Sequence, residues 1–182
     1  MGVLDHSIEK VLFSERKIKK KVEELGKQIS DDYSGKKLLL VGILKGSAMF
    51  MADLMRAIKV PCEIDFMVVS SYGSDTKTSG NVKIIKDLNI DIKGYDLLIV
   101  EDIIDSGNTI SALKKLLNER NPESVKICTL FDKPSRRTAN VKTDYYGAIV
   151  SDEFIVGYGL DYNEKFRNLP YVGVLKRECY EK

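Results

Sequence analysis

Three acidic side chains lie within five residues of one another in the stretch LLIVEDIIDSGNTI, residues 97–110. Glu101 and Asp102 follow a run of apolar residues, and Asp105 comes three positions later. Two neighbouring carboxylates can each accept a hydrogen bond from one hydroxyl of a vicinal diol. Ligands of open α/β sheets bind outside the carboxyl ends of the strands, which is where we expect Glu101 and Asp102 to emerge. The acids therefore predict a site for a sugar diol.

A short polar loop, Ser106, Gly107, Asn108 and Thr109, follows the last acid and leads into a predicted helix. It offers backbone N–H groups, a glycine that permits close approach and two hydroxyls, a combination typical of phosphate-binding loops at helix N-termini. A diol site and a phosphate site a few residues apart describe a ribose 5-phosphate. The alternative is a plain strand–turn–helix connection with solvent-exposed acids, which is disfavoured because three acids crowd the end of a buried strand.

The composition argues against several other classes of protein. The chain has 182 residues, enough for one sizeable core, and we place no domain boundary in it. Its 29 Lys and Arg against 27 Asp and Glu leave a formal net charge of +2, which argues against a dedicated duplex-DNA binder. A single histidine, His6, excludes a paired-histidine zinc site and a histidine relay. Three scattered cysteines and the lack of a long apolar stretch predict a cytoplasmic protein.

The rest of the chain alternates between segments typical of strands and of helices. Ser14 is the expected N-cap of a helix over 15–33, whose apolar residues recur at steps of four and three. Residues 71–81, SYGSDTKTSGN, are predicted to form a mobile loop. The alternation predicts an α/β fold with a largely parallel sheet. Further helices are predicted at 48–58 and 110–117, and strands at 38–43, 62–70, 82–86, 96–100 and 125–131, with shorter ones near 145–149, 154–158 and 171–175.

Residues 100–109 resemble the phosphoribosyl-diphosphate signature of type I phosphoribosyltransferases. Three further segments narrow the resemblance to the hypoxanthine-guanine phosphoribosyltransferases of the bacterial type: LKGS at 44–47, FDKP at 131–134 and FIVGYGLDYNE at 154–164. The resemblance implies one phosphoribosyltransferase domain over 1–182. Its fold would have a mostly parallel central sheet, helices on both faces, and a small hood built from terminal segments.

The resemblance also implies the chemistry. A family member uses Mg²⁺ and transfers the 5-phosphoribosyl group from 5-phosphoribosyl 1-diphosphate to N9 of hypoxanthine or guanine, giving IMP or GMP and diphosphate in purine salvage. Asp105 matches the carboxylate that faces N7 of the purine, the candidate catalytic acid–base residue. By the same match the 5-phosphate is bound by Ser106, Gly107, Asn108 and Thr109; the ribose by Glu101 and Asp102; the diphosphate by Lys45, Gly46, Ser71, Tyr72 and Arg167; the base by Lys133, Phe154 and Ile155; and the metal by Glu101, Asp102 and Asp161.

Some expectations rest on the resemblance alone: a cis Leu44–Lys45 peptide and a homodimer or homotetramer. The near-neutral charge balance and the short apolar runs predict neither a nucleic-acid nor a membrane partner. Without the resemblance, Lys133 would be interpreted as an ordinary turn lysine and Phe154 as a core residue. Two alternatives stay open: a phosphoribosyltransferase for another base, such as xanthine or a pyrimidine, and an RNA-binding regulator with the same fold.

Overall fold

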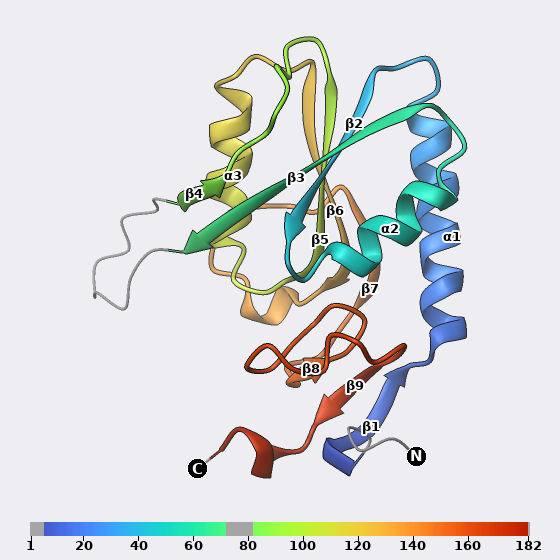
Figure 1. The fold of residues 1–182 in the computed structure, drawn as a ribbon, viewed down its shortest axis with the longest axis vertical. Coiled ribbons are helices and arrows are strands. Elements are labelled where there is room, and N and C mark those ends of the chain that lie inside the picture. The colour runs from blue at the N-terminus through green and yellow to red at the C-terminus, as the bar shows by residue number, and fades with distance from the viewer. Residues whose placement is uncertain (1–5, 72–81, 182) are drawn as a thin grey trace.

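The computed structural model describes residues 6–71 and 82–181. In these ranges the chain forms a six-stranded sheet, a three-stranded sheet and three α-helices (Figure 1). The helices are α1 (Glu15–Asp32), α2 (Ala48–Ala57) and α3 (Asn108–Asn118). The strands are β1 (Ile8–Phe13), β2 (Leu38–Leu44), β3 (Cys62–Ser71), β4 (Val82–Lys86), β5 (Asp96–Ile104), β6 (Ser124–Asp132), β7 (Tyr145–Ile149), β8 (Ile155–Val156) and β9 (Val172–Leu175).

The large sheet has the strand order β4-β3-β2-β5-β6-β7. Neighbouring strands from β3 to β7 are parallel, and the edge strand β4 runs antiparallel to β3. Helices α1 and α2 cover one face of this sheet, and α3 covers the other (Figure 1). The predicted α/β fold, with a mostly parallel sheet and helices on both faces, is therefore confirmed.

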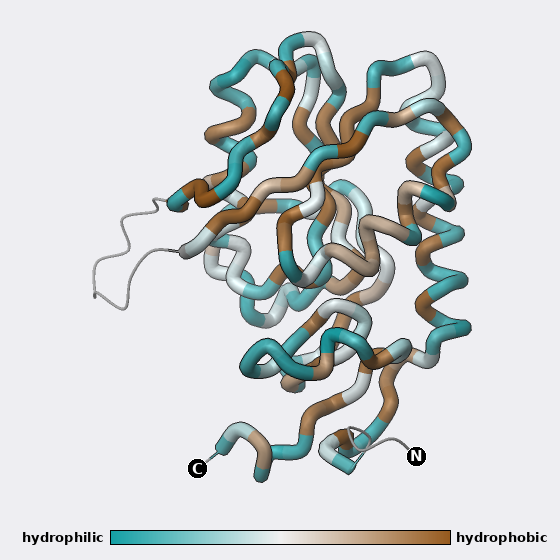
Figure 2. The backbone as a smooth tube through the Cα atoms, in the orientation of Figure 1, coloured by the Kyte–Doolittle hydropathy of each residue, from teal (hydrophilic) through white to brown (hydrophobic). Residues whose placement is uncertain are grey.

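The central strands β2 and β5 are apolar along most of their length because helices cover both faces of the sheet. Leu40 and Leu98 face the core under α1 and α2, whereas Leu39 and Leu97 face the core under α3. All four side chains are fully buried. Successive side chains of a strand point to opposite faces, so a strand between two helical layers must be apolar at every position. The central strands are correspondingly hydrophobic in Figure 2.

Helix α1 packs on the sheet through the apolar stripe that its sequence predicts. The hydroxyl of Ser14 accepts a hydrogen bond from the N–H of Lys17 (3.4 Å), which confirms the predicted N-cap. Each fully buried aliphatic side chain of the stripe contributes about 1.5–3 kcal/mol. The stripe consists of Ile18, Val22, Leu25 and Ile29.

The three-stranded sheet forms a hood near the end of the large sheet at which β2 and β3 terminate (Figure 1). Its strand order is β1-β9-β8, and both pairings are antiparallel. The predicted hood of terminal segments is confirmed, but no strand is predicted over 8–13, so β1 corrects the sequence analysis. Glu9 and Lys10 interrupt the apolar pattern there. The partner strand β9 lies at the other end of the chain, so no local signal indicates the pairing.

Strand β5 is longer than the predicted strand over 96–100, because it continues to Ile104. Glu101 and Asp102 therefore belong to the strand itself, and Glu101 is paired with Thr129 of β6. Ladder pairing involves only the backbone, so it continues through charged residues whose side chains leave the apolar core. The correction moves the strand end by four residues and keeps the acids at the carboxyl end of β5.

Two further expectations, the mobile loop over 71–81 and the cytoplasmic location, are not tested by the described residues. Apart from Ser71, the last residue of β3, the predicted mobile loop over 71–81 lies outside the described residues, and Tyr72 lies there too. Within 6–71 and 82–181, no helix is long and apolar enough to cross a membrane. The cytoplasmic location stays a prediction.

Candidate active site

The acid pair lies in the last part of β5, where both side chains are partly buried. Burial and the neighbouring Asp102 charge raise the pKa of Glu101 well above its ordinary value. Burial also raises the pKa of Asp102 to about 6, although its carboxylate accepts a hydrogen bond from the N–H of Ile103 (2.7 Å). Two carboxyl groups held together with little solvent favour a cation or hydroxyl donors as ligands.

The loop after β2 approaches Asp102 so closely that only a glycine fits at position 46. A Cβ atom on Gly46 would lie 1.8 Å from Asp102 Oδ2. A Cβ atom on Gly159 would in turn lie 2.1 Å from the carbonyl oxygen of Gly46. The Leu44–Lys45 peptide that precedes Gly46 is cis, as the resemblance implies. The two glycines therefore let two backbone segments and a carboxylate meet at one place.

The polar loop after β5 leads directly into α3, as predicted for a phosphate site. Gly107 is the N-cap of α3 with φ +78°, a left-handed conformation that favours glycine. Ser106, Gly107 and Thr109 line a cavity of about 370 Å³ together with the acid pair; we call it the phosphate cavity. The side-chain oxygen of Asn108 instead accepts a hydrogen bond from the hydroxyl of Thr138 (3.4 Å), and in the described chain Asn108 does not line this cavity.

A second cavity, of about 440 Å³, adjoins the first, and we call it the base cavity. Lys133, Phe154 and Ile155, the three predicted base-binding residues, all line it. Asp102 and Asp105 line both cavities, as do Ile103 and Asp161. The wall shared by the two cavities is therefore acidic.

Lys133 is buried directly after β6, with 5% of the residue exposed. Its Nζ donates a hydrogen bond to the carbonyl oxygen of Glu153 (3.1 Å) and lies 3.2 Å from Asp105 Oδ1. That carboxylate oxygen is buried and, among the described residues, has no hydrogen-bond partner, so the contact is ionic. The Asp105 side chain is nevertheless 46% exposed, which leaves it accessible to a ligand. A turn lysine would be exposed, so the burial of Lys133 supports the binding interpretation.

Phe154 forms an aromatic wall of the base cavity and is 39% exposed. Its ring stacks on Tyr180 (centroids 4.9 Å apart, interplanar angle 23°) and meets the edge of Tyr162 (5.6 Å, 88°). A core phenylalanine would be buried, whereas an exposed ring on a cavity offers a stacking surface for a planar ligand. Sequence analysis missed Tyr180, which follows the last strand in a segment without an informative pattern.

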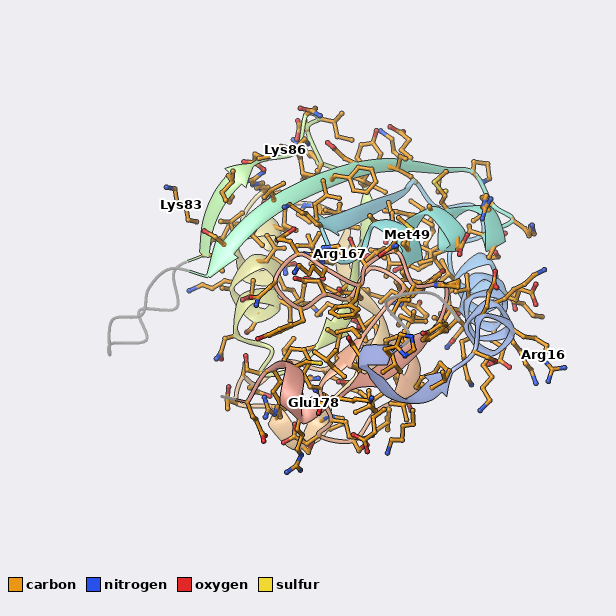
Figure 3. All side chains as sticks on the ribbon, turned by 60° about the horizontal axis from the view of Figure 1, so that its bottom comes forward. Arg16, Met49, Lys83, Lys86, Arg167 and Glu178 are labelled. Atoms are coloured by element: carbon orange, nitrogen blue, oxygen red, sulfur yellow. The ribbon has the colours of Figure 1, made fainter. Side chains whose placement is uncertain are left out.

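Arg167 lies near the centre of the molecule in Figure 3, and both Arg167 and Asp161 line the phosphate cavity. The guanidinium donates to the carbonyl oxygen of Gly159 (2.7 Å) and pairs with Asp161 (2.8 Å). Its Nε is buried and has no hydrogen-bond partner among the described residues, which makes this guanidinium a candidate contact for an anion. The other predicted diphosphate cation, Lys45, instead pairs with the exposed Glu164 (2.9 Å) and lines neither cavity in the described chain.

The predicted metal ligands are not assembled into a ready-made cluster. Among the described residues, no three His, Cys, Asp or Glu side chains lie together in a group that could hold a metal ion. Glu101, Asp102 and Asp161 nevertheless all line the phosphate cavity, and the Asp161 charge contributes to the raised pKa of Asp102. Mg²⁺ is usually held by one or two carboxylates together with substrate phosphates and waters. The residues therefore fit a Mg²⁺ ion that binds with a phosphorylated substrate.

Comparison with known proteins agrees with this geometry. Residues 10–163 match the phosphoribosyl transferase domain family. The chain belongs to this family. The hypoxanthine-guanine phosphoribosyltransferase of Bacillus subtilis (strain 168) is 55% identical over 179 residues, 98% of this chain and 99% of the relative. The hypoxanthine phosphoribosyltransferase of Salmonella typhimurium (strain LT2) is 54% identical over 172 residues, 93% of this chain and 96% of the relative.

A solved structure agrees as well. The crystal structure of a hypoxanthine phosphoribosyltransferase from Staphylococcus aureus superposes with a TM-score of 0.97 at 49% identity, covering 100% of this chain and 98% of the other. The resemblance to the hypoxanthine-guanine phosphoribosyltransferases, drawn from four short motifs, is therefore confirmed.

Proposed function

We propose that this phosphoribosyltransferase transfers the 5-phosphoribosyl group of 5-phosphoribosyl 1-diphosphate to N9 of hypoxanthine or guanine. The observation that carries the proposal is the pair of adjoining cavities with a shared acidic wall. One cavity combines an acid pair with a helix N-terminus, and the other combines a buried lysine with an exposed aromatic ring. The names of relatives at 54–55% identity support hypoxanthine and guanine as the bases.

In the proposed complex the phosphate cavity holds the sugar diphosphate. The backbone N–H groups of 106–109 and the hydroxyls of Ser106 and Thr109 bind the 5-phosphate at the start of α3. Glu101 and Asp102 accept hydrogen bonds from the two ribose hydroxyls. Asn108 contributes through its backbone, because its side chain faces Thr138.

The diphosphate lies between Gly46 and Arg167, whose buried Nε lacks a protein partner among the described residues. Lys45 reaches the diphosphate after exchanging its pairing with Glu164, an exposed ion pair that costs little to break. Ser71 and Tyr72 stay predicted diphosphate contacts. When bound by Glu101, Asp102 and Asp161, Mg²⁺ supplies positive charge that neutralises the diphosphate.

The purine occupies the base cavity. Lys133 donates to its 6-oxo oxygen, Phe154 stacks on its ring, and the backbone of Ile155 contacts its edge. As N9 bonds to C1, the bond from C1 to the diphosphate oxygen breaks and its electron pair leaves with the diphosphate. Asp105 takes the proton from N7. Positive charge develops at C1 beside the acidic wall, so the chain acts chiefly by positioning and electrostatics.

A diphosphate-release assay with five bases tests the proposal. Hypoxanthine and guanine should support turnover, whereas adenine, whose 6-amino group faces the Lys133 ammonium donor to donor, should not. Xanthine and uracil in the same panel test the alternative bases. Preference for adenine or uracil would contradict the base assignment. An absence of diphosphate release with all five bases, together with nucleotide-dependent retention of RNA at physiological salt, would favour the regulator instead. The homodimer or homotetramer stays a prediction, which light scattering can test.

A further inference from the structure

Three consecutive backbone carbonyls at the entrance to the phosphate-binding loop are held by a single neighbouring segment, residues 133–139. All three belong to 104–106, between the end of β5 and the start of α3. Ile104 O accepts from the N–H of Lys133 (3.0 Å), Asp105 O from Nε of Arg137 (3.1 Å), and Ser106 O from the N–H groups of Thr138 and Ala139 (3.0 Å each).

This anchoring fixes the direction of the amides that follow each carbonyl. In a planar trans peptide the C=O of one residue and the N–H of the next point in opposite directions. The N–H groups of Asp105, Ser106 and Gly107 therefore point away from segment 133–139. All three residues line the phosphate cavity. The carbonyl anchors thus aim successive amide donors at the position proposed for the 5-phosphate.

Arg137 is the one side chain in this segment that contacts several of these groups at once. Its guanidinium donates to the carbonyl oxygens of Asp105 (3.1 Å), Val141 (2.9 Å) and Ile104 (3.4 Å) and forms an ion pair with Asp132. The side chain is 15% exposed. In the described part of the chain it lines neither cavity.

The remaining contacts of Arg137 hold the guanidinium in place. Asp132 accepts a further hydrogen bond from the hydroxyl of Thr143 (3.0 Å), so the carboxylate is itself fixed. A Cβ atom on Gly107 would lie 2.8 Å from Arg137 Cδ, so the arginine stem lies directly behind the N-cap of α3. A cation bonded to a carbonyl also polarises that peptide and strengthens its N–H as a donor.

We propose that Arg137 is a positioning residue for the 5-phosphate: it holds the Ile104 and Asp105 carbonyls so that the following amides face the phosphate. The inference rests on the proposed function, because the phosphate belongs to the sugar substrate. Arg137 touches no substrate. Its removal should loosen the phosphate cavity while leaving the base cavity in place, because that cavity is lined largely by residues 152–161 and 177–181.

The test measures ligand binding and kinetics for Arg137→Met and Arg137→Lys. Arg137→Met should raise Kd for ribose 5-phosphate and KM for the sugar diphosphate by about 10–100-fold, because misdirected amides weaken several charge-assisted hydrogen bonds to the phosphate. KM for hypoxanthine should change by less than about threefold. Arg137→Lys should recover part of the affinity, because an ammonium can keep the Asp132 pair and one carbonyl contact.

Arg120→Met is the matched control. Arg120 also forms an ion pair with an aspartate, through two contacts with Asp87 (2.8 Å each), but it lies beyond the opposite end of α3. The Arg120→Met variant removes the same charge and a similar ion pair. It should leave Kd for ribose 5-phosphate unchanged, together with KM for the sugar diphosphate and for hypoxanthine.

The experiment distinguishes a failure of the proposed function from a failure of the role proposed for Arg137. Wild-type protein that binds neither ribose 5-phosphate nor the sugar diphosphate would overturn the proposed function. If the wild-type protein binds ribose 5-phosphate and the Kd of Arg137→Met is within twofold of the wild-type value, only the role of Arg137 is overturned. An equal rise in KM for both substrates would also overturn it, because that result indicates a general structural defect. If Arg137→Met does not fold, Asp132→Asn, which removes the ion-pair partner of Arg137, replaces it in the test. The affinity for ribose 5-phosphate should then fall at least about threefold while KM for hypoxanthine is preserved, and an unchanged affinity would overturn the role of Arg137.

Discussion

Replacing Gly46 by alanine should disable the sugar site through a single steric contact. The added Cβ would lie 1.8 Å from Asp102 Oδ2, whereas real Cβ atoms essentially never approach closer than 3.0 Å. The carboxylate or the loop after β2 must therefore move by about 1.2 Å. A misplacement of that size in a catalytic site costs about 10²-fold in rate, so kcat/KM for the sugar diphosphate should fall by about that factor. Steady-state kinetics at saturating hypoxanthine measures the effect.

Stability measurements identify the cause of that loss. Overpacking should cost Gly46→Ala about 1–3 kcal/mol of unfolding free energy in urea. In an Asp102→Ala background the atoms that the new Cβ meets are gone, so the same substitution should cost much less. If Gly46→Ala destabilises both backgrounds equally, the overlap with Asp102 is not the reason, and the geometric argument is refuted.

Three further predictions concern the two cavities. Lys133→Met should lower kcat/KM for hypoxanthine and guanine together by about 10–100-fold, because both lose the same donor to the 6-oxo group; rates within twofold of wild type would require another donor. Thr109→Val should weaken sugar-diphosphate binding by about 1–3 kcal/mol in calorimetry, and an unchanged affinity would place the 5-phosphate elsewhere. Asp102→Asn should stabilise the metal-free fold while impairing sugar binding. Because the folded pKa of Asp102, about 6, exceeds its ordinary value of 3.8, the ionised group opposes folding increasingly as pH rises from about 4 to about 6. Denaturation in EDTA should therefore show a gain of up to about 3 kcal/mol at pH 7.5 and little at pH 4, and equal stabilities at pH 7.5 would contradict the burial argument.

Local sequence was informative where one segment carries a whole structural unit. The apolar runs of β2 and β5 predict strands buried on both faces, and the stripe of α1 predicts an amphipathic helix. The acids Glu101, Asp102 and Asp105 and the loop that follows them predict a sugar-phosphate site by their own chemistry. The structure places all of these residues except Asn108 around one cavity.

Residues whose roles depend on distant partners could not be found in this way. The pattern around Lys133 and Phe154 is uninformative by itself, and both were predicted from the family resemblance alone. Tyr180 acts through Phe154, and Arg137 acts largely through backbone carbonyls, which leave no side-chain pattern in the sequence. The Lys45 pairing with Glu164 likewise joins residues far apart in the chain.

The central claim is that Asp105, at the wall shared by the two cavities, handles the purine proton. Asp105→Asn keeps the size of the side chain and removes its ability to take that proton. Steady-state kinetics with hypoxanthine and the sugar diphosphate should show kcat reduced by about 10²–10⁴-fold, with KM for the sugar diphosphate changed far less. A variant with near-normal kcat and a large KM defect would contradict the account, because Asp105 would then only bind substrate.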